Sequence, residues 1–269
     1  MQIVAYRLIN TLNDSEYEST EAHLAKSLLD ILEELPMLPI DQVAERCHVS
    51  KSTISKFVKY LGFSDYRDFR ENAKNEGKKS AYHNYEEKLS MDRCIERYGI
   101  QKYLRIIRQD VEEIQNMVDQ KQIHALAEAI YQHKNIAAFG SVYSETVAID
   151  FMYQMAEEGK YIKTNVYDMK QRQFIIQATE EDLIIIFSNS GQYIFEEGMR
   201  PYDMSQSYVR KTKAKLALVT SNKAAALNGC VNYPVLYQFT SIVQNHPIIS
   251  RIVVQMIVDE YKKIANKNK

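Results

Sequence analysis

The sequence IDQVAERCHVSKSTISKFVKYLGF, at residues 40–63, predicts two short helices joined by a tight turn. In the first helix, the small residue Ala44 lies on the apolar face, where a crossing helix can approach closely. Ser50 is placed to cap the second helix, and Gly62 is placed to end it. The second helix has an apolar stripe at i, i+4 and i+7, formed by Ile54, Val58 and Leu61. This arrangement is typical of a helix-turn-helix.

The polar side of the second helix carries short hydroxyl side chains and lysines. Short side chains let a helix enter the major groove, and lysines at a helix start can bind phosphates. The residues expected to contact DNA are Ser50, Lys51, Ser52, Thr53, Ser55, Lys56 and Lys59. The alternative is an ordinary amphipathic hairpin with a solvated polar face, because short helix-turn-helix patterns also arise by chance.

The distribution of charge favours selective DNA binding over general coating of nucleic acid. The whole chain has a net charge of −1 and a pI near 6.6. Residues 46–80 nevertheless hold nine basic and four acidic side chains, whereas residues 1–45 hold two basic and nine acidic ones. A local positive surface on an otherwise acidic chain fits a protein that uses phosphates for positioning and a few bases for specificity.

The composition allows two domains or one large domain, and it indicates neither a metal site nor a cofactor. A chain of 269 residues with 45% hydrophobic content can bury two cores. The three cysteines, Cys47, Cys94 and Cys230, lack metal-ligand spacing, so we expect reduced thiols. Polar residues come too early for a signal peptide, and no apolar run is long enough for a membrane span. We therefore expect a cytoplasmic protein with no membrane partner.

The expected organisation is a helical domain at residues 1–76, a linker at 77–99 and a second domain at 100–269. Two further helices, near residues 20–35 and 65–75, flank the helix-turn-helix in the first domain. The linker begins in a segment rich in charge and tyrosine that shows no sustained period. Helices near 100–118 and 120–133 lead into the second half.

The second half alternates short apolar runs with helical patterns, which predicts a doubly wound α/β fold with a parallel sheet. The expected strands are 135–140, 161–168, 183–188, 215–221 and 232–238. The expected helices are 142–158, 170–179, 192–211, 222–229 and 247–266. Ligands of such sheets bind beyond the carboxyl ends of the strands. Two strand ends carry glycine and hydroxyl residues there, at 140–144 and 188–191.

The chain resembles the RpiR (MurR/RpiR) family of bacterial transcriptional regulators over nearly its whole length. The strongest match is VSKSTISKF at 49–57, followed by LGF at 61–63. In the second half, FGSVYSETVAID at 139–150 and FSNSG at 187–191 resemble the turns of the family's sugar isomerase (SIS) domain. The resemblance implies that these turns hold the phosphate of a sugar phosphate, through Ser144, Ser188, Ser190 and the backbone of Gly191.

Two residues depart from the family pattern. Val142 occupies a position where the family often has glycine, and Tyr193 one where it usually has threonine or serine. The α/β half could therefore be a dimerisation platform with a different ligand or none. A third alternative is an active sugar-phosphate isomerase with Glu196 or Glu197 as its base, although helix residues in solvent are the simpler account of both.

The favoured interpretation is a non-enzymatic regulator that binds double-stranded DNA and senses a phosphorylated sugar. Homodimerisation is expected because a single helix-turn-helix seldom binds tightly, and paired half-sites match a two-fold protein.

Overall fold

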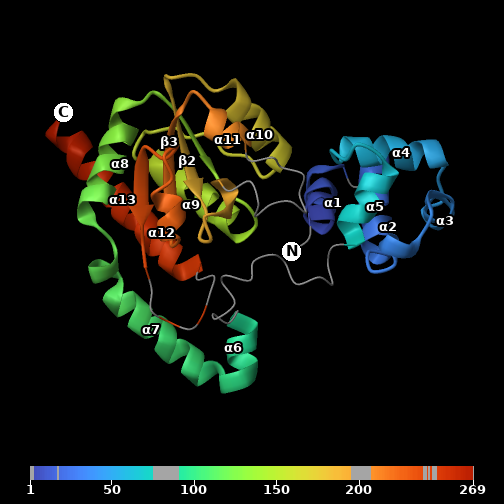
Figure 1. Ribbon diagram of the computed structural model, residues 1–269, viewed down its shortest axis with the longest axis horizontal. Helices are drawn as coiled ribbons and strands as arrows, with labels where there is room; N and C mark the ends of the chain where they lie inside the picture. Colours follow the sequence, from blue (N-terminus) through green and yellow to red (C-terminus); the bar gives the residue numbers. More distant parts are fainter. Residues whose placement is uncertain are drawn as a thin grey trace. The chain divides into compact units, whose positions relative to one another are not determined.

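A group of short helices and a four-stranded parallel sheet covered by helices make up the described part of the chain (Figure 1). This computed structural model describes residues 3–16, 18–74, 91–194, 207–238, 241, 243 and 247–268. The chain divides into two units, one of residues 1–81 with 200–203 and one of residues 82–199 with 204–269. Each unit is described below by itself.

The first unit is entirely helical over its described residues. Its elements are α1 (Ile3–Asp14), α2 (Thr20–Asp30), the 3-10 helix η1 (Leu35–Met37), α3 (Ile40–Arg46), α4 (Lys51–Tyr60) and α5 (Tyr66–Lys74). The expected helices are confirmed, except that α2 ends at Asp30 because Leu35–Met37, with Pro36, forms η1. The core contains Leu8, Leu24, Leu28, Val43, Ile54, Val58 and Phe69. The apolar stripe predicted for the second helix is thus buried.

Both helices of the helix-turn-helix end in a Schellman motif. After α4, the Gly62 N–H donates to Lys59 O at 2.9 Å and the Phe63 N–H donates to Val58 O at 3.2 Å. Gly62 has a φ of 86°, as this motif requires. After α3, the same position is held by His48, whose φ is 53° although it has a side chain. The turn between the two helices therefore stores a small backbone strain.

We expect His48→Gly to stabilise the first unit by roughly 0.5–1 kcal/mol. Glycine adopts the left-handed conformation without a Cβ clash, and this gain exceeds its larger entropy loss on folding. The midpoint of urea denaturation measures the change. His48→Ala keeps the Cβ and is the control; equal midpoints for the two variants would show that the turn is unstrained.

The second unit contains a parallel sheet in the order β1-β2-β3-β4. Its strands are β1 (Asn135–Phe139), β2 (Asp182–Phe187), β3 (Lys215–Thr220) and β4 (Tyr233–Leu236). Its helices are α6 (Met91–Tyr98), α7 (Ile100–Met117), α8 (Gln120–Gln132), α9 (Tyr143–Glu157), α10 (Asp168–Gln177), α11 (Ser207–Lys211), α12 (Lys223–Ala226) and α13 (Pro247–Lys267), with the 3-10 helix η3 (Gln192–Ile194).

Both faces of the sheet are covered, which confirms the doubly wound fold. Helices α8, α9 and α13 pack on one face, where they share a core with strand residues such as Ala138 and Ile185. On the opposite face, the Phe174 ring of α10 lies 5.5 Å from the Phe139 ring of β1, measured between centroids. The connection from β1 to β2 therefore places α9 on one face of the sheet and α10 on the other, while the strands follow one another across the sheet in chain order.

The prediction of a strand at 161–168 is wrong. Only Lys163 pairs with β1: its N–H donates to Ile136 O at 2.9 Å, and its carbonyl accepts from the Ala138 N–H at 2.8 Å. Two residues later the Asn165 side chain accepts from the Tyr167 N–H at 2.9 Å. This local turn leads the chain into α10 and ends the pairing with the sheet.

Two other boundaries differ from the prediction. α6 occupies residues 91–98 of the predicted linker; its apolar residues Met91, Cys94, Ile95 and Tyr98 recur at helical spacing, but the pattern is only 8 residues long. The predicted helix 192–211 begins as η3 and ends as α11, and residues 195–206 lie outside the described residues. Across the parts that the structure describes, no helix is both long and apolar enough to cross a membrane.

Candidate functional site

The start of α4 is built from linked hydroxyl groups. Ser50 is the N-cap, and its Oγ accepts from the Thr53 N–H at 3.1 Å, as predicted. The same Oγ lies 2.7 Å from Ser52 Oγ and 2.8 Å from Thr53 Oγ1. These contacts fix the first turn of α4 and hold its hydroxyls at the exposed end of the helix.

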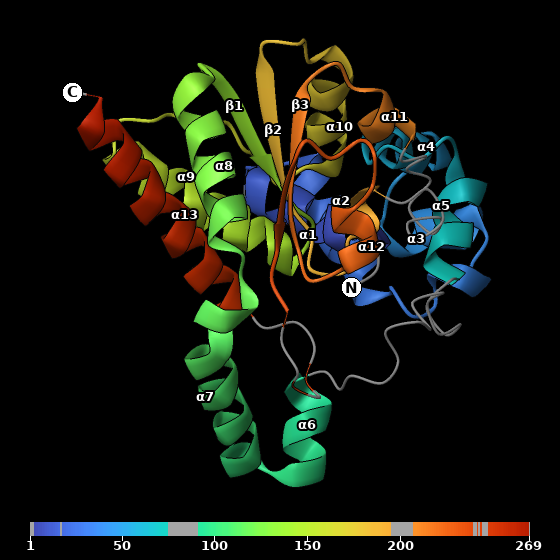
Figure 2. The same ribbon diagram turned by 60° about the vertical axis from the view of Figure 1, so that its left-hand side comes forward.

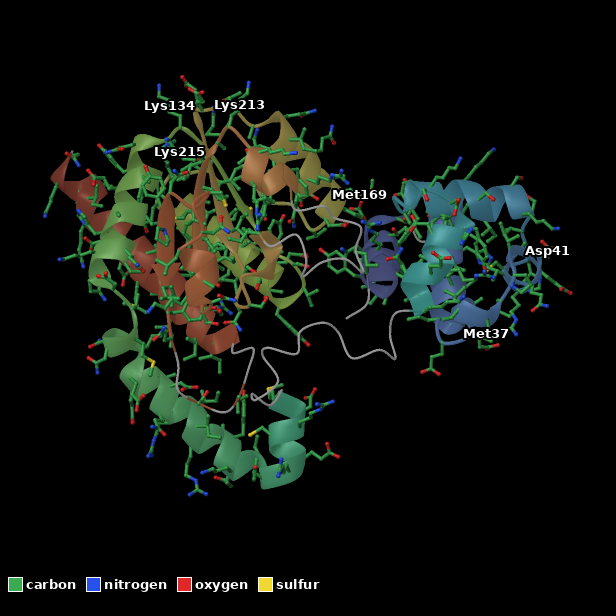
Figure 3. All side chains as sticks on the ribbon, viewed as in Figure 1. Met37, Asp41, Lys134, Met169, Lys213 and Lys215 are labelled. Atoms are coloured by element: carbon green, nitrogen blue, oxygen red, sulfur yellow. The ribbon has the colours of Figure 1, made fainter. Side chains whose placement is uncertain are left out.

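The lysines of α4 differ in how they are paired. Lys51 forms an exposed ion pair of 2.6 Å with Asp41 of α3, which Figure 3 labels. Lys56 and Lys59 are exposed and form no ion pair with any residue in the described ranges. Together with exposed Ser52 they occupy one face of α4, whereas Ser55 is half-buried beside it. Lys56 and Lys59 are therefore the two α4 cations with the least competition for a phosphate.

Arg7 of α1, which the sequence analysis missed, supports the end of α4. Its guanidinium is buried, donates to Leu61 O at 3.0 Å, and lies 4.8 Å from the centre of the Phe63 ring. The carbonyl at the helix end thus receives a charged donor where the macrodipole favours one. The contact joins residues 54 positions apart, so no local pattern reveals it.

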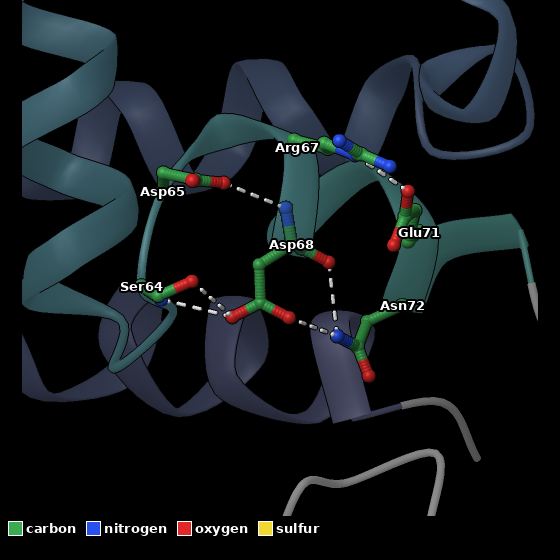
Figure 4. A network of polar contacts seen from close by, with 6 residues as sticks. All are labelled: Ser64, Asp65, Arg67, Asp68, Glu71 and Asn72. Atoms are coloured by element: carbon green, nitrogen blue, oxygen red, sulfur yellow. Dashed lines mark hydrogen bonds and ion pairs between the residues drawn. The ribbon is translucent and has the colours of Figure 1, made fainter.

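The segment after α4 is held by a small polar network at the start of α5 (Figure 4). Asp68 Oδ2 accepts from Ser64 N and Ser64 Oγ at 2.8 and 3.2 Å, and Asp65 Oδ1 accepts from Asp68 N at 2.9 Å. Asn72 Nδ2 donates to Asp68 O and Oδ1, each at 2.9 Å. These bonds satisfy the first turn of α5 and fix the short connection from α4.

In the second unit, the turn after β1 has a backbone that suits glycine at two positions. A Cβ at Gly140 would overlap the backbone of Ser144 and Glu145. Val142 has φ 56° and ψ −114°, which a β-branched residue seldom adopts. The turn thus has a conformation that suits glycine, and half-buried Ser144 lies in the first turn of α9.

The turn after β2 is held by the loop that follows β3. Gly191 has a φ of 72°, and a Cβ there would overlap the side chain of Ala225. Asn222 caps α12 and donates through Nδ2 to Ser190 O at 2.8 Å. Ser188 is buried, whereas Ser190 is half-buried. Because β1 and β2 are parallel neighbours, the two serine-bearing turns lie at the same edge of the sheet.

Tyr193 connects the two turns through α10. Its N–H donates to Ser188 Oγ at 3.4 Å, and its hydroxyl donates to Gln171 Oε1 at 2.6 Å. Gln171 Nε2 in turn donates to Gly140 O at 3.0 Å and Asn165 O at 2.6 Å. The Tyr193 ring is therefore buried, with its hydroxyl bonded to α10. Tyr193 was recognised from the sequence as a departure from the family pattern, whereas no sequence pattern pointed to Gln171.

The lysine-rich edge of the sheet is its amino edge, opposite the carboxyl edge that carries these turns. Lys134, Lys213 and Lys215 lie at the amino ends of β1 and β3 (Figure 3). At the carboxyl edge the buried side chains include Glu145 in the first turn of α9. Among the described residues, no group of three or more acidic, histidine or cysteine side chains could hold a metal ion. Glu196 and Glu197 lie outside the described residues.

The N-terminal residues 7–80 match the family model described as "Helix-turn-helix domain, rpiR family". An uncharacterised HTH-type transcriptional regulator of Providencia stuartii is 23% identical over 195 residues, which cover 71% of this chain and 67% of that protein. The HTH-type transcriptional regulator GlvR of Bacillus subtilis is 27% identical over 191 residues, which cover 67% of this chain and 63% of GlvR.

Solved structures show the same fold. NanR of Vibrio vulnificus, complexed with ManNAc-6P, aligns with a TM-score of 0.50 at 14% identity over 98% of this chain and 93% of NanR. The sugar isomerase domain of an RpiR transcription factor from Sphaerobacter thermophilus aligns with a TM-score of 0.50 at 14% identity, over 62% of this chain and 93% of that one. The chain therefore has an N-terminal helix-turn-helix domain, as its curated relatives do, and an α/β domain with the fold of a sugar isomerase domain. Its match to the rpiR family covers the helix-turn-helix domain at residues 7–80.

Proposed function

We propose that this regulator contacts operator DNA with α4 and senses a phosphorylated sugar at the turns after β1 and β2. The DNA contacts are assigned to Ser50, Lys51, Ser52, Thr53, Ser55, Lys56 and Lys59. Phosphates would be held by the lysines and by the start of α4, while Ser52 and Thr53 would face base edges. The exposed face of Ser52, Lys56 and Lys59 supports this assignment.

The effector site is assigned to Ser144, Ser188, Ser190 and Gly191. The observation that carries this proposal is the pair of turns with positive φ, at Val142 and Gly191, on neighbouring parallel strands. Turns of this kind place hydroxyls where an anion can bind, at the start of a helix. The Gly191 N–H itself donates to Ser188 O at 2.9 Å, so a ligand would have to displace that bond. The NanR structure, which has the same fold, contains a sugar phosphate.

A sugar phosphate would transmit a signal by binding two conformational states of the protein with unequal affinity. A sugar phosphate that binds one state of a cytoplasmic homodimer more tightly shifts the population toward it, and so alters the spacing of the two DNA-reading units. The Tyr193–Gln171 connection supports coupling between the two turns, because a ligand that moves one of them disturbs the other.

Thermal denaturation with single sugar phosphates tests the effector site. We expect one of them at 100 times its Kd to stabilise the protein by about 2.7 kcal/mol, and Ser190→Ala to lose most of that gain. Ser52→Ala removes the same hydroxyl from α4 and should keep the full shift. A shift of equal size in Ser190→Ala would contradict the assignment, as would the absence of a shift with every sugar phosphate.

A SIS-like domain without a phosphate site is the second candidate. The buried Ser188, whose hydroxyl accepts from Tyr193, and the buried acidic Glu145 beside Ser144 favour it. An acidic side chain next to the anion site would repel a phosphate. This candidate predicts a discrete DNA site whose occupancy does not respond to sugar phosphates.

A further inference from the structure

Asn189 lies between the two serines of the turn after β2, and its main chain is held from β3. Its carbonyl accepts from the Ser221 N–H at 3.1 Å and from Ser221 Oγ at 2.8 Å. The Thr220 hydroxyl donates to the same carbonyl at 3.2 Å. The turn that carries Ser188 and Ser190 is therefore attached at its middle to the carboxyl end of the neighbouring strand.

The side chain of Asn189 is held by a buried tyrosine. Tyr237, the residue after β4, has 2% of its surface exposed, and its hydroxyl donates to Asn189 Oδ1 at 2.9 Å. A hydroxyl has one hydrogen, and this bond uses it. The Ser250 hydroxyl, 3.2 Å away, must therefore donate to the tyrosine oxygen. The Tyr237 hydroxyl thus both donates and accepts, as expected of a polar group in a core.

Tyr237 is a rigid support for the side chain that it holds. Its N–H donates to Thr220 O at 3.0 Å, and its main chain pairs with Val118, between α7 and α8. Its ring belongs to the core that the sheet shares with α8, α9 and α13. Ser250 lies in the first turn of α13, which packs along α8 (Figure 2). The position of the tyrosine oxygen is therefore fixed by the sheet and by α13 together.

We propose that Tyr237 is a positioning residue of the effector site, which holds the turn at 188–191 in its binding conformation through Asn189. This inference rests on the proposed function, because it concerns the same turn. Tyr237 acts through Asn189 and needs no contact with a ligand. Without the hydroxyl, the Asn189 side chain loses a fixed donor, and the turn gains freedom that a ligand must remove when it binds.

Amide hydrogen exchange of the full chain without ligand tests the support itself. The reporters are the N–H groups of Gly191 and Ser221, whose bonds within the turn and to the turn measure 2.9 and 3.1 Å. We expect Tyr237→Phe to speed the exchange of both by about tenfold, as loss of one hydrogen bond would. Tyr233→Phe removes the same group at the amino end of β4 and is the control. Equal rates in the two variants would overturn the proposal.

Ligand affinity separates a positioning role from a merely structural one. The probes are inorganic phosphate and a panel of hexose and pentose phosphates, titrated by calorimetry. For each probe that binds the wild type, we expect Tyr237→Phe to raise the Kd by about tenfold, and to leave the affinity for operator DNA without effector unchanged. Tyr233→Phe should change neither affinity. An unchanged Kd in Tyr237→Phe would overturn the proposal.

A double-mutant cycle assigns the effect to the bond between the two side chains. Asn189→Ala should also raise the Kd, and Tyr237→Phe should add nothing to it, because both changes remove the same bond. Effects that multiply in the double variant would overturn the proposal. If no probe binds the wild type, the phosphate site proposed for these turns fails, whereas the exchange rates still decide the role of Tyr237.

Discussion

Replacement of Gly140 by alanine is expected to destabilise the α/β domain by about 3 kcal/mol, the upper end of overpacking costs. A Cβ at this position would overlap the backbone of Ser144 and Glu145, and a helix start cannot move aside as the end of a flexible side chain can. The variant should also lose any stabilisation by sugar phosphates, because the turn carrying Ser144 would be displaced.

Urea denaturation followed by far-UV circular dichroism measures this loss, with Gly229→Ala as the matched control. A Cβ at Gly229 meets no atom within 4 Å, so this variant should stay within about 0.5 kcal/mol of wild type, as surface substitutions usually do. If Gly140→Ala were as stable as Gly229→Ala, the close packing of the β1 turn on α9 would be refuted.

The double variant Lys56→Ala/Lys59→Ala is expected to bind operator DNA on the order of 100-fold more weakly at about 0.1 M salt. Both lysines are exposed on the α4 face, and each phosphate contact releases about one counterion. The slope of log K against log salt concentration should therefore fall by about two, which titrations at several salt concentrations measure.

Lys26→Ala is the control for this variant, since Lys26 lies in α2 and is paired with Asp30 at 2.9 Å. It also removes one positive charge from the first unit, but it should leave the salt slope unchanged. Ser52→Ala and Thr53→Ala should instead change the preferred sequence. If Lys56→Ala/Lys59→Ala kept the wild-type salt slope, and Ser52→Ala and Thr53→Ala kept the wild-type footprint, α4 would be excluded as the DNA-reading helix.

The helix-turn-helix was predictable because its determinants are local. The Ser50 cap, the buried Ile54–Val58–Leu61 stripe and the Gly62 Schellman motif all lie between residues 50 and 63, and the structure has all three. Helix α1 and its Arg7 were missed because their role is tertiary: the guanidinium supports a carbonyl 54 residues away. A local sequence pattern cannot predict such a contact.

The parallel strands of the α/β domain were predictable from the sequence, but the conformation of its candidate site was less so. The apolar run at 161–168 resembles a strand, yet only Lys163 pairs with β1 because the Asn165 turn intervenes. The sequence identified Val142 and Tyr193 as departures. The backbone of Val142 and the bond from Tyr193 to Gln171 depend on tertiary packing, so they needed the structure.

We propose that this chain is a DNA-binding regulator that responds to a sugar phosphate. The most direct test is selection of bound fragments from the source genome by the purified full chain, with and without a mixed pool of sugar phosphates. We predict enrichment of a discrete palindromic site whose occupancy changes with the pool. A discrete site whose occupancy is indifferent to the pool would contradict the sensing role, and the absence of any enriched site would contradict DNA recognition itself.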